Sequence, residues 1–177
     1  RTFTRAALQA LDENAVLDGL VLREPASVPQ KTLLRARLLL TRTTGVFEQI
    51  QRYEKQGYCG LVRKSSNWLD ALHVLRKDEP HFLFAKGNLK LLKTDCVAVA
   101  GSRIITEETA EMAARLGRMM ASEKLTMVCG GANGVDTAAQ NAILDAGGNL
   151  IIVPAVSAEK VIWQEREKRA LDEGRLL

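Results

Sequence analysis

The fold is decided by two stretches, Val97-Ala98-Val99-Ala100-Gly101-Ser102-Arg103 and Leu125-Thr126-Met127-Val128-Cys129-Gly130-Gly131-Ala132-Asn133-Gly134-Val135-Asp136. In each, an apolar run ends in a break that contains glycine, and a segment with helical periodicity follows. The repeated order of apolar run, glycine break and helix predicts a βαβα unit. Continuous apolar runs, as opposed to alternating ones, are typical of parallel strands that are buried on both faces.

The connections between such strands determine where the two breaks lie. Right-handed crossovers bring the carboxyl ends of parallel strands to one edge of the sheet, where open α/β folds bind ligands. A third apolar run, residues 150–153, follows Gly147-Gly148 and extends the sheet. The sequence therefore predicts an α/β fold with a Rossmann-like, doubly wound, mostly parallel sheet, preceded by a small helical N-terminal region. We place the domain boundary after residue 57, so that residues 58–177 form the Rossmann-like domain.

Helical patterns dominate residues 1–57. Two prolines within residues 25–29 interrupt them, and Gly57 is placed where a C-terminal cap is expected. A break at Thr43-Thr44-Gly45 between two short helices is typical of either a helix-turn-helix or a plain helical packing unit. The four predicted helices cover residues 4–11, 14–22, 32–41 and 46–56.

Shorter elements connect this region to the first break and complete the domain. Polar residues 64–67 are suited to cap a helix at 68–75, in which Trp68, Leu72 and Leu75 share a face that we expect to be buried. Thr106 is the predicted N-cap of the helix after the first break. The other predicted elements are strands at 58–63 and 81–85, a helical turn at 89–93, a charged helix at 159–171 and the beginning of a strand at 175–177.

The composition is that of an ordinary globular protein, with 46% hydrophobic and 26% charged residues. Cys96 and Cys129 flank predicted strands, and we expect them to be buried, reduced thiols of a cytoplasmic protein. The cysteine and histidine spacing does not suit a metal site, and we expect no metal, no cofactor and no membrane association. Because the chain begins at Arg1 and ends on Leu177, we expect it to be a fragment or a processed form.

The charge is unevenly distributed along the chain. The formal net charge is +4. Residues 1–93 carry 16 Lys or Arg and 9 Asp or Glu, a net charge of +7, whereas residues 94–177 carry 9 and 12, a net charge of −3. A basic first half is compatible with a polyanionic partner, and equally with a well-solvated surface.

The two breaks carry the groups that an anion would need. Backbone N–H groups at a helix N-terminus bind anions without a charged side chain. Gly101 allows a ligand close to the backbone, Ser102 adds a hydroxyl donor, and Arg103 adds a planar cationic fork suited to phosphate. The predicted phosphate- or DNA-binding residues are Gly101, Ser102, Arg103, Gly130, Gly131, Ala132, Asn133, Gly134 and Asp136.

The second break can be interpreted in more than one way. Asp136 falls in the first turn of the next helix, where it can bond free N–H groups, pin the neighbouring loop, or contact a ribose or base directly. The pattern is neither the dinucleotide-binding fingerprint nor a P-loop, so each break can also be a structural turn. No histidine lies near Ser102 in the sequence, and no nucleophile–base pair supports catalysis.

Three linked motifs resemble those of the DNA-processing Smf/DprA family. They are Phe82-Leu83-Phe84-Ala85-Lys86-Gly87-Asn88-Leu89, Val97 to Arg103, and Gly130-Gly131-Ala132-Asn133-Gly134-Val135-Asp136-Thr137-Ala138-Ala139. The resemblance extends over roughly residues 58–177. It implies an extended Rossmann fold, binding of single-stranded DNA, transfer of that DNA to a RecA-type recombinase in natural transformation, and a homodimer without enzymatic activity.

Two departures from the family pattern bear on the site. Members usually carry Arg at the position of Asn133, and often His at the position of Gln140. A neutral side chain at Asn133 removes one phosphate contact. It is expected to reduce the slope of log affinity against log salt concentration for DNA binding by about one unit.

Two other functions remain open. The same loops could hold a small nucleotide, in a sensor or in an enzyme that cleaves nucleoside monophosphates, although the Pro-Gly-Gly-x-Gly-Thr-x-x-Glu motif of that enzyme group does not occur here. Alternatively, the loops could be structural and the domain could dock a protein partner.

Overall fold

A computed structural model describes residues 31, 43–63 and 68–177, and the chain divides into two compact units, Arg1–Arg52 and Tyr53–Leu177. Most of α3, Thr43–Lys55, belongs to the first unit. Because α3 already begins at Thr43, the predicted interruption at Gly45 is wrong. The helix ends before Gly57, whose positive φ of 84° suits the predicted cap. The helices predicted at 4–11, 14–22 and 32–41 lie outside the described residues, and the boundary at residue 57 stays a prediction.

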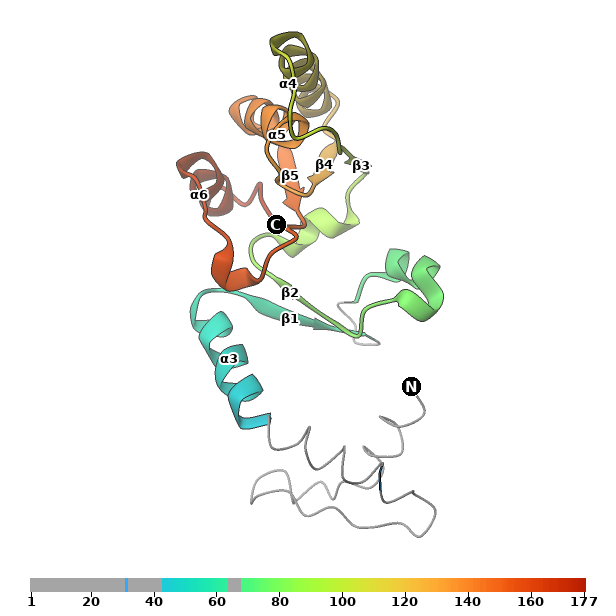
Figure 1. Cartoon of the computed structure of the whole chain (residues 1–177), viewed down its shortest axis with the longest axis vertical. Helices are drawn as coiled ribbons and strands as arrows, with labels where there is room; N and C mark the ends of the chain where they lie inside the picture. Colours follow the sequence, from blue (N-terminus) through green and yellow to red (C-terminus); the bar gives the residue numbers. More distant parts are fainter. Residues whose placement is uncertain (1–30, 32–42, 64–67) are drawn as a thin grey trace. The chain divides into compact units, whose positions relative to one another are not determined.

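The second unit contains two separate sheets (Figure 1). The strands β1, Cys59–Val62, and β2, Phe82–Ala85, form an antiparallel hairpin. The parallel sheet has the order β3-β4-β5, with bounds Cys96–Ala98, Thr126–Cys129 and Asn149–Ile152. Leu176 forms a parallel bridge with Leu150, so a strand does begin near the C-terminus as predicted.

Helices α4, Glu107–Ser122, α5, Val135–Asp145, and α6, Glu165–Asp172, contribute to one core with the sheet (Figure 1). The crossovers through α4 and α5 proceed in the same direction across the sheet, so right-handed connections place both helices on one face. The buried members of this core are Val99, Ala113, Met120, Met127, Cys129, Ala139, Ile143, Leu144, Leu150, Ala170 and Leu176.

The opposite face of the sheet is covered by the short 3₁₀ helix η2, Leu89–Lys93. Its Leu91 packs with Ile151 and Leu177 in a second apolar cluster. The predicted α/β, Rossmann-like class is confirmed. Within the part of the chain described, the second layer comes from the segment that precedes the sheet, not from a crossover helix.

The strand β3 lies at the edge of the described sheet and is exposed along its length. Val97 keeps 40% of its surface accessible. Cys96 is likewise exposed, so the expectation that it is buried is wrong, whereas Cys129 on β4 is buried as predicted. The apolar run at residues 97–100 could not distinguish an edge strand from a central one, because that difference depends on neighbouring strands.

The contact between α4 and α5 depends on a glycine within α4. A Cβ added at Gly117 would lie 2.4 Å from the carbonyl oxygen of Ala139, so the two helices approach to a distance that only glycine permits. At the start of α4, Thr106 caps the helix as predicted, since its Oγ1 accepts a hydrogen bond from Thr109 N at 3.2 Å.

A buried carboxylate organises the segment between β1 and β2. Glu79, 4% exposed, accepts a 2.8 Å hydrogen bond from Trp68 Nε1 and lies 2.7 Å from both Arg63 Nη2 and His73 Nδ1. Burial raises the pKa of the Glu79 carboxyl, but the hydrogen bonds from Trp68 and His73 and the charge of Arg63 hold that pKa below its usual value of 4.5.

The helix predicted at 68–75 differs from the structure in type and position. The observed segment η1, Asp70–Asp78, is 3₁₀ in character and is interrupted at Arg76, which adopts a positive φ of 49°. Leu75 is 45% exposed, so it does not share a buried face with Trp68. The capping residues predicted at 64–67 lie outside the described residues.

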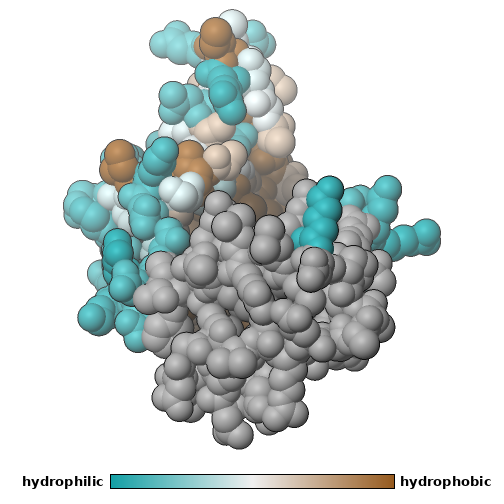
Figure 2. All heavy atoms as spheres, turned by 60° about the horizontal axis from the view of Figure 1, so that its bottom comes forward, coloured by the Kyte–Doolittle hydropathy of each residue, from teal (hydrophilic) through white to brown (hydrophobic). Residues whose placement is uncertain are grey.

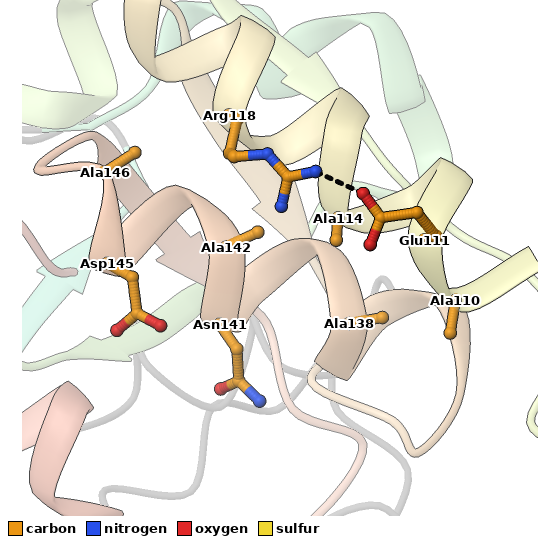
Figure 3. A pocket seen from close by; sticks show the side chains of 9 residues that line it. All are labelled: Ala110, Glu111, Ala114, Arg118, Ala138, Asn141, Ala142, Asp145 and Ala146. Carbon is orange, nitrogen blue, oxygen red and sulfur yellow. Dashed lines mark hydrogen bonds and ion pairs between the residues drawn. The ribbon is translucent and has the colours of Figure 1, made fainter. Parts of the chain in front are cut away.

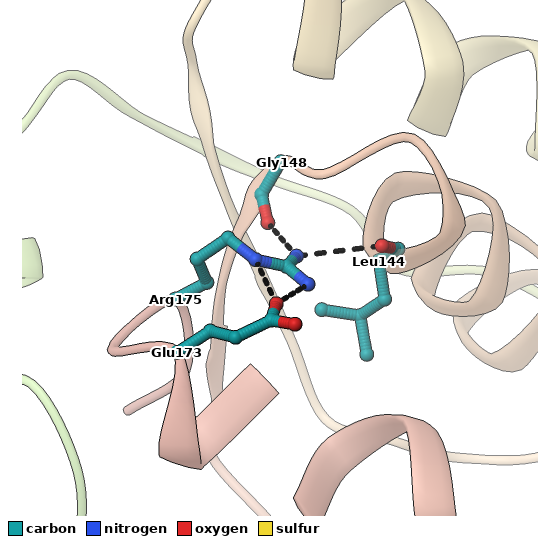
Figure 4. Close-up of polar contacts among 4 residues, drawn as sticks. All are labelled: Leu144, Gly148, Glu173 and Arg175. Carbon is teal, nitrogen blue, oxygen red and sulfur yellow. Dashed lines mark hydrogen bonds and ion pairs between the residues drawn. The ribbon is translucent and has the colours of Figure 1, made fainter. Parts of the chain in front are cut away.

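The C-terminal helix is shorter than predicted. The range 159–171 contains a 3₁₀ turn, Ala158–Lys160, and then α6, which begins with a capping box formed by Gln164 and Glu167. After α6, Arg175 pairs with Glu173 and donates hydrogen bonds to the carbonyl oxygens of Gly148 and Leu144 (Figure 4). This side chain satisfies carbonyls at the end of α5 and holds the last residues beside β5.

Surface hydropathy on one face is mixed. Figure 2 shows hydrophobic residues there as separate patches among hydrophilic ones. No helix in the described ranges is long and apolar enough to cross a bilayer.

Replacing Glu79 tests the buried carboxylate. Glu79→Gln should lower the free energy of unfolding near neutral pH, because three donors lose their charged acceptor. Since the folded-state pKa is lowered, the wild-type contribution is complete above about pH 4.5 and is lost as the pH falls further. Denaturant titrations at neutral and acidic pH should show a smaller pH effect in the variant. Glu165→Gln, which removes the exposed pair with Lys168, is the control and should change stability little.

Candidate functional site

The two glycine breaks meet at the carboxyl edge of the parallel sheet. Val135 N donates a 3.1 Å hydrogen bond to the carbonyl oxygen of Ser102. A Cβ on Gly134 would lie 2.1 Å from that same oxygen, and one on Gly101 would lie 2.6 Å from Val135 Cβ. Gly101 and Gly134 therefore let the first loop, residues 99–105, pack directly against the second, residues 130–134.

The second loop is closed on itself by Asp136. This residue is 5% exposed, and its Oδ2 accepts hydrogen bonds from Gly130 N at 3.1 Å and from Ala132 N at 3.4 Å. Thr137 donates from both its backbone N and its Oγ1 to the carbonyl oxygen of Ala132. Of the interpretations open for Asp136, the geometry matches the one in which it pins the neighbouring loop.

The hydroxyl of Ser102 is engaged within the first loop. Its Oγ donates to the carbonyl oxygen of Ile104 at 2.7 Å and accepts from Ile104 N at 3.3 Å. The Ser102 side chain thus stabilises the turn that follows it. Both of these hydrogen bonds of its hydroxyl are made within the first loop. We call this pair of bonds the Ser102 clamp.

The first loop retains unengaged donors. Among the described residues, no acceptor pairs with the N–H groups of Gly101, Ser102 and Arg103, and no carboxylate pairs with the Arg103 guanidinium. Because the Ser102 carbonyl points at Val135 N, the Arg103 N–H on the opposite side of the same planar trans peptide points away from α5. Residues 101–103 are exposed and α4 begins only at Glu107, so their three amides are donors of a loop and not of a helix end. Together with the cationic fork of Arg103 they form a suitable arrangement for an oxyanion.

The other predicted positions differ in their surroundings. Asn133 is exposed on the second loop and brings no charge. Gln140 is buried, donates to Glu167 and lies 3.8 Å from Cys129 Sγ, so it joins β4, α5 and α6 in the interior. Burial, with the negative charges of Asp136 and Glu167, raises the pKa of the Cys129 thiol to about 11 despite a hydrogen bond from Gly131, so this thiol is unreactive at neutral pH.

A groove of about 520 Å³ between α4 and α5 lies apart from these loops and shares no residue with them. Figure 3 shows alanines of both helices lining it, with Arg118 paired to Glu111 at its border. Within the described ranges, no three His, Cys, Asp or Glu residues are grouped so as to hold a metal ion.

Sequence reasoning missed Ile104, which is 91% exposed immediately after Arg103. The apolar character of this residue made it unremarkable in a chain with 46% hydrophobic residues. Its backbone is bonded to the Ser102 hydroxyl in the Ser102 clamp, a contact that the sequence pattern did not reveal.

The close packing of the two loops can be tested at Gly134. In Gly134→Ala the new Cβ lies 2.1 Å from the Ser102 carbonyl oxygen, and an L side chain is placed at a φ of 92°, where it is strained. Gly147→Ala, with a φ of 78° and no atom within 4 Å, is a control that carries positive-φ strain without any overlap. Thermal unfolding should show Gly134→Ala to be less stable by about 2 kcal/mol more than the control, and exchange of the Val135 amide, which donates to the Ser102 carbonyl oxygen, should accelerate. Equal losses in both variants would contradict the packing.

The family model of DNA recombination-mediator protein A matches residues 60–172. DNA processing protein DprA of Streptococcus pneumoniae (strain ATCC BAA-255 / R6) is 40% identical over 95 residues, which are 54% of this chain and 33% of that protein. The chain therefore spans about a third of the length of this curated relative.

Solved structures agree with the sequence comparison. The X-ray structure of DprA from Streptococcus pneumoniae superposes with a TM-score of 0.65 at 26% identity, over 85% of this chain and 50% of that one. DNA processing protein A from Helicobacter pylori, a structure described for its single-stranded DNA binding mode, gives a TM-score of 0.50 at 28% identity, over 67% and 52% of the two chains. With more than half of its residues matched by the family model, the chain belongs to the family of DNA recombination-mediator protein A.

Proposed function

We propose that this chain binds single-stranded DNA without catalysing a reaction on it, and that the first loop holds the DNA backbone. The observation that carries the proposal is the group of three amides at Gly101, Ser102 and Arg103, which, like the Arg103 guanidinium, have no partner among the described residues. Family membership and the Helicobacter pylori relative, which is described as binding single-stranded DNA, support the choice of ligand.

The proposed mechanism is one of positioning and charge. Non-bridging oxygens of a phosphodiester accept hydrogen bonds from the loop amides, while the Arg103 fork contacts one phosphate in a bidentate manner. Because these contacts reach only the backbone, binding through them has little sequence preference and depends strongly on salt.

In this proposal the predicted site residues have two different roles. Gly101, Ser102 and Arg103 provide the donors. Gly130, Gly131, Ala132, Gly134 and Asp136 form the support on which the first loop is held, through the bonds of Asp136 to the second loop and of Val135 to Ser102. Asn133 lies exposed beside them and can add a neutral amide contact.

The wider role follows from the family. We propose that the chain, in the cytoplasm and as a homodimer, protects incoming single-stranded DNA and passes it to a RecA-type recombinase. The description of the family as recombination mediators supports this role.

Removing the Arg103 fork tests the proposed site. Arg103→Ala should weaken binding of a labelled single-stranded oligonucleotide and reduce the magnitude of the slope of log affinity against log salt by about 0.7 to 1. Fluorescence anisotropy at several salt concentrations measures both quantities. Arg115→Ala removes an exposed arginine of α4 that has no partner in the described residues, and it should leave the slope almost unchanged.

A competition step distinguishes DNA from a small nucleotide. If a nucleoside monophosphate displaces the oligonucleotide at equal phosphate concentration, the loops hold a single nucleotide and the proposal is wrong. Release of free base in the same tube would show enzymatic cleavage.

A further inference from the structure

Ile104 is an unusual neighbour for a phosphate-binding group. It is 91% exposed and follows directly after Arg103, whereas most aliphatic side chains of this size in the unit are partly or fully buried. A single exposed aliphatic residue on a protein surface needs no explanation. This one, however, has a hydrogen-bonded backbone and follows a guanidinium that has no acidic partner within the described ranges.

The position of Ile104 is held by two hydrogen bonds to one side chain. Ser102 Oγ donates to the Ile104 carbonyl oxygen at 2.7 Å and accepts from its N–H at 3.3 Å. The Ser102 carbonyl is in turn held by Val135 N at the start of α5. The Ile104 backbone is therefore ordered before any ligand arrives, and a ligand that covers its side chain loses little conformational entropy of the loop.

Another exposed aliphatic residue lies on the third loop of the same sheet edge. Val153, directly after β5, is 64% exposed, and its N–H donates to the carbonyl oxygen of Cys129 at 2.8 Å. A Cβ on Gly130 would lie 3.9 Å from the Val153 carbonyl oxygen, so the third loop adjoins the second. We name Ile104 and Val153 the aliphatic rim.

We propose that the aliphatic rim receives the nucleobases of the single-stranded DNA whose phosphates bind at Gly101, Ser102 and Arg103, with Ile104 as the base contact next to Arg103. This inference rests on the proposed function and adds a second class of contact to it. A nucleotide carries an anionic phosphate and an apolar base face side by side. The first loop offers, in consecutive residues, a cation without an acidic partner in the part of the chain that the structure describes and an exposed aliphatic side chain.

The placement favours nucleobases over an apolar protein partner. An apolar partner would have to cover Arg103 and the three free amides together with Ile104, and burying those donors without acceptors is costly. A nucleotide satisfies them with phosphate oxygens while its base covers Ile104. Aromatic residues, on which bases usually stack, make up only 5% of this chain. Contact between a base and an aliphatic side chain therefore matters more here than base stacking.

The test compares two ligands of equal charge on the 177-residue chain. One is an oligothymidylate, and the other is a strand of the same length built from abasic phosphodiester units. Ile104→Ser should lower the affinity for the oligothymidylate about threefold to tenfold and leave the affinity for the abasic strand unchanged. Ile104→Trp should raise the affinity for the oligothymidylate alone, because a ring gives a larger stacking surface.

Met119→Ser is the matched control. Met119 is 55% exposed on α4, and its loss should affect neither ligand. If Ile104→Ser weakens both ligands equally, or neither, the inference is overturned while the backbone site stands. If the wild-type chain binds neither ligand, the proposed function fails and this inference fails with it.

Discussion

The hydrogen bond from Val135 N to the Ser102 carbonyl joins the ends of two different strands, and the candidate site depends on it. Through this bond the start of α5 determines the orientation of the peptide between Ser102 and Arg103. Two glycines without Cβ atoms permit the approach, and the Asp136 carboxylate keeps the second loop in the shape that makes it possible. Donors on the first loop are thus ordered by residues that need never touch a ligand.

The sequence was most informative where a pattern is local. Apolar runs bounded by glycine or proline located β3, β4 and β5 to within one or two residues, and Thr106 was identified as a cap because capping involves neighbours in the chain. The grouping of both breaks at one sheet edge followed from the handedness of crossovers. These features depend on backbone geometry that the same residue types impose in many chains.

What could not be predicted depends on partners distant in sequence. Glu79 follows two charged residues in the sequence, yet it is buried because Arg63, Trp68 and His73 converge on it. Gly101 and Gly134 were interpreted as openings for a ligand, whereas in the structure their missing side chains make room for the other loop. Both cases concern the identity of a neighbour, on which a single sequence gives no information.

The unequal cysteines of the sheet have a practical consequence. Cys96 is exposed on the edge strand, whereas Cys129 is buried directly before the second loop with a thiol pKa of about 11. Because the thiol pKa lies well above neutral pH, very few Cys129 side chains are thiolates there, and cysteine-alkylating reagents react with the thiolate. The alkylation rate of exposed Cys96 therefore serves as a reference for a thiol that the reagent reaches without any opening of the fold. The much slower alkylation rate of buried Cys129 measures how often the core beneath the two loops opens.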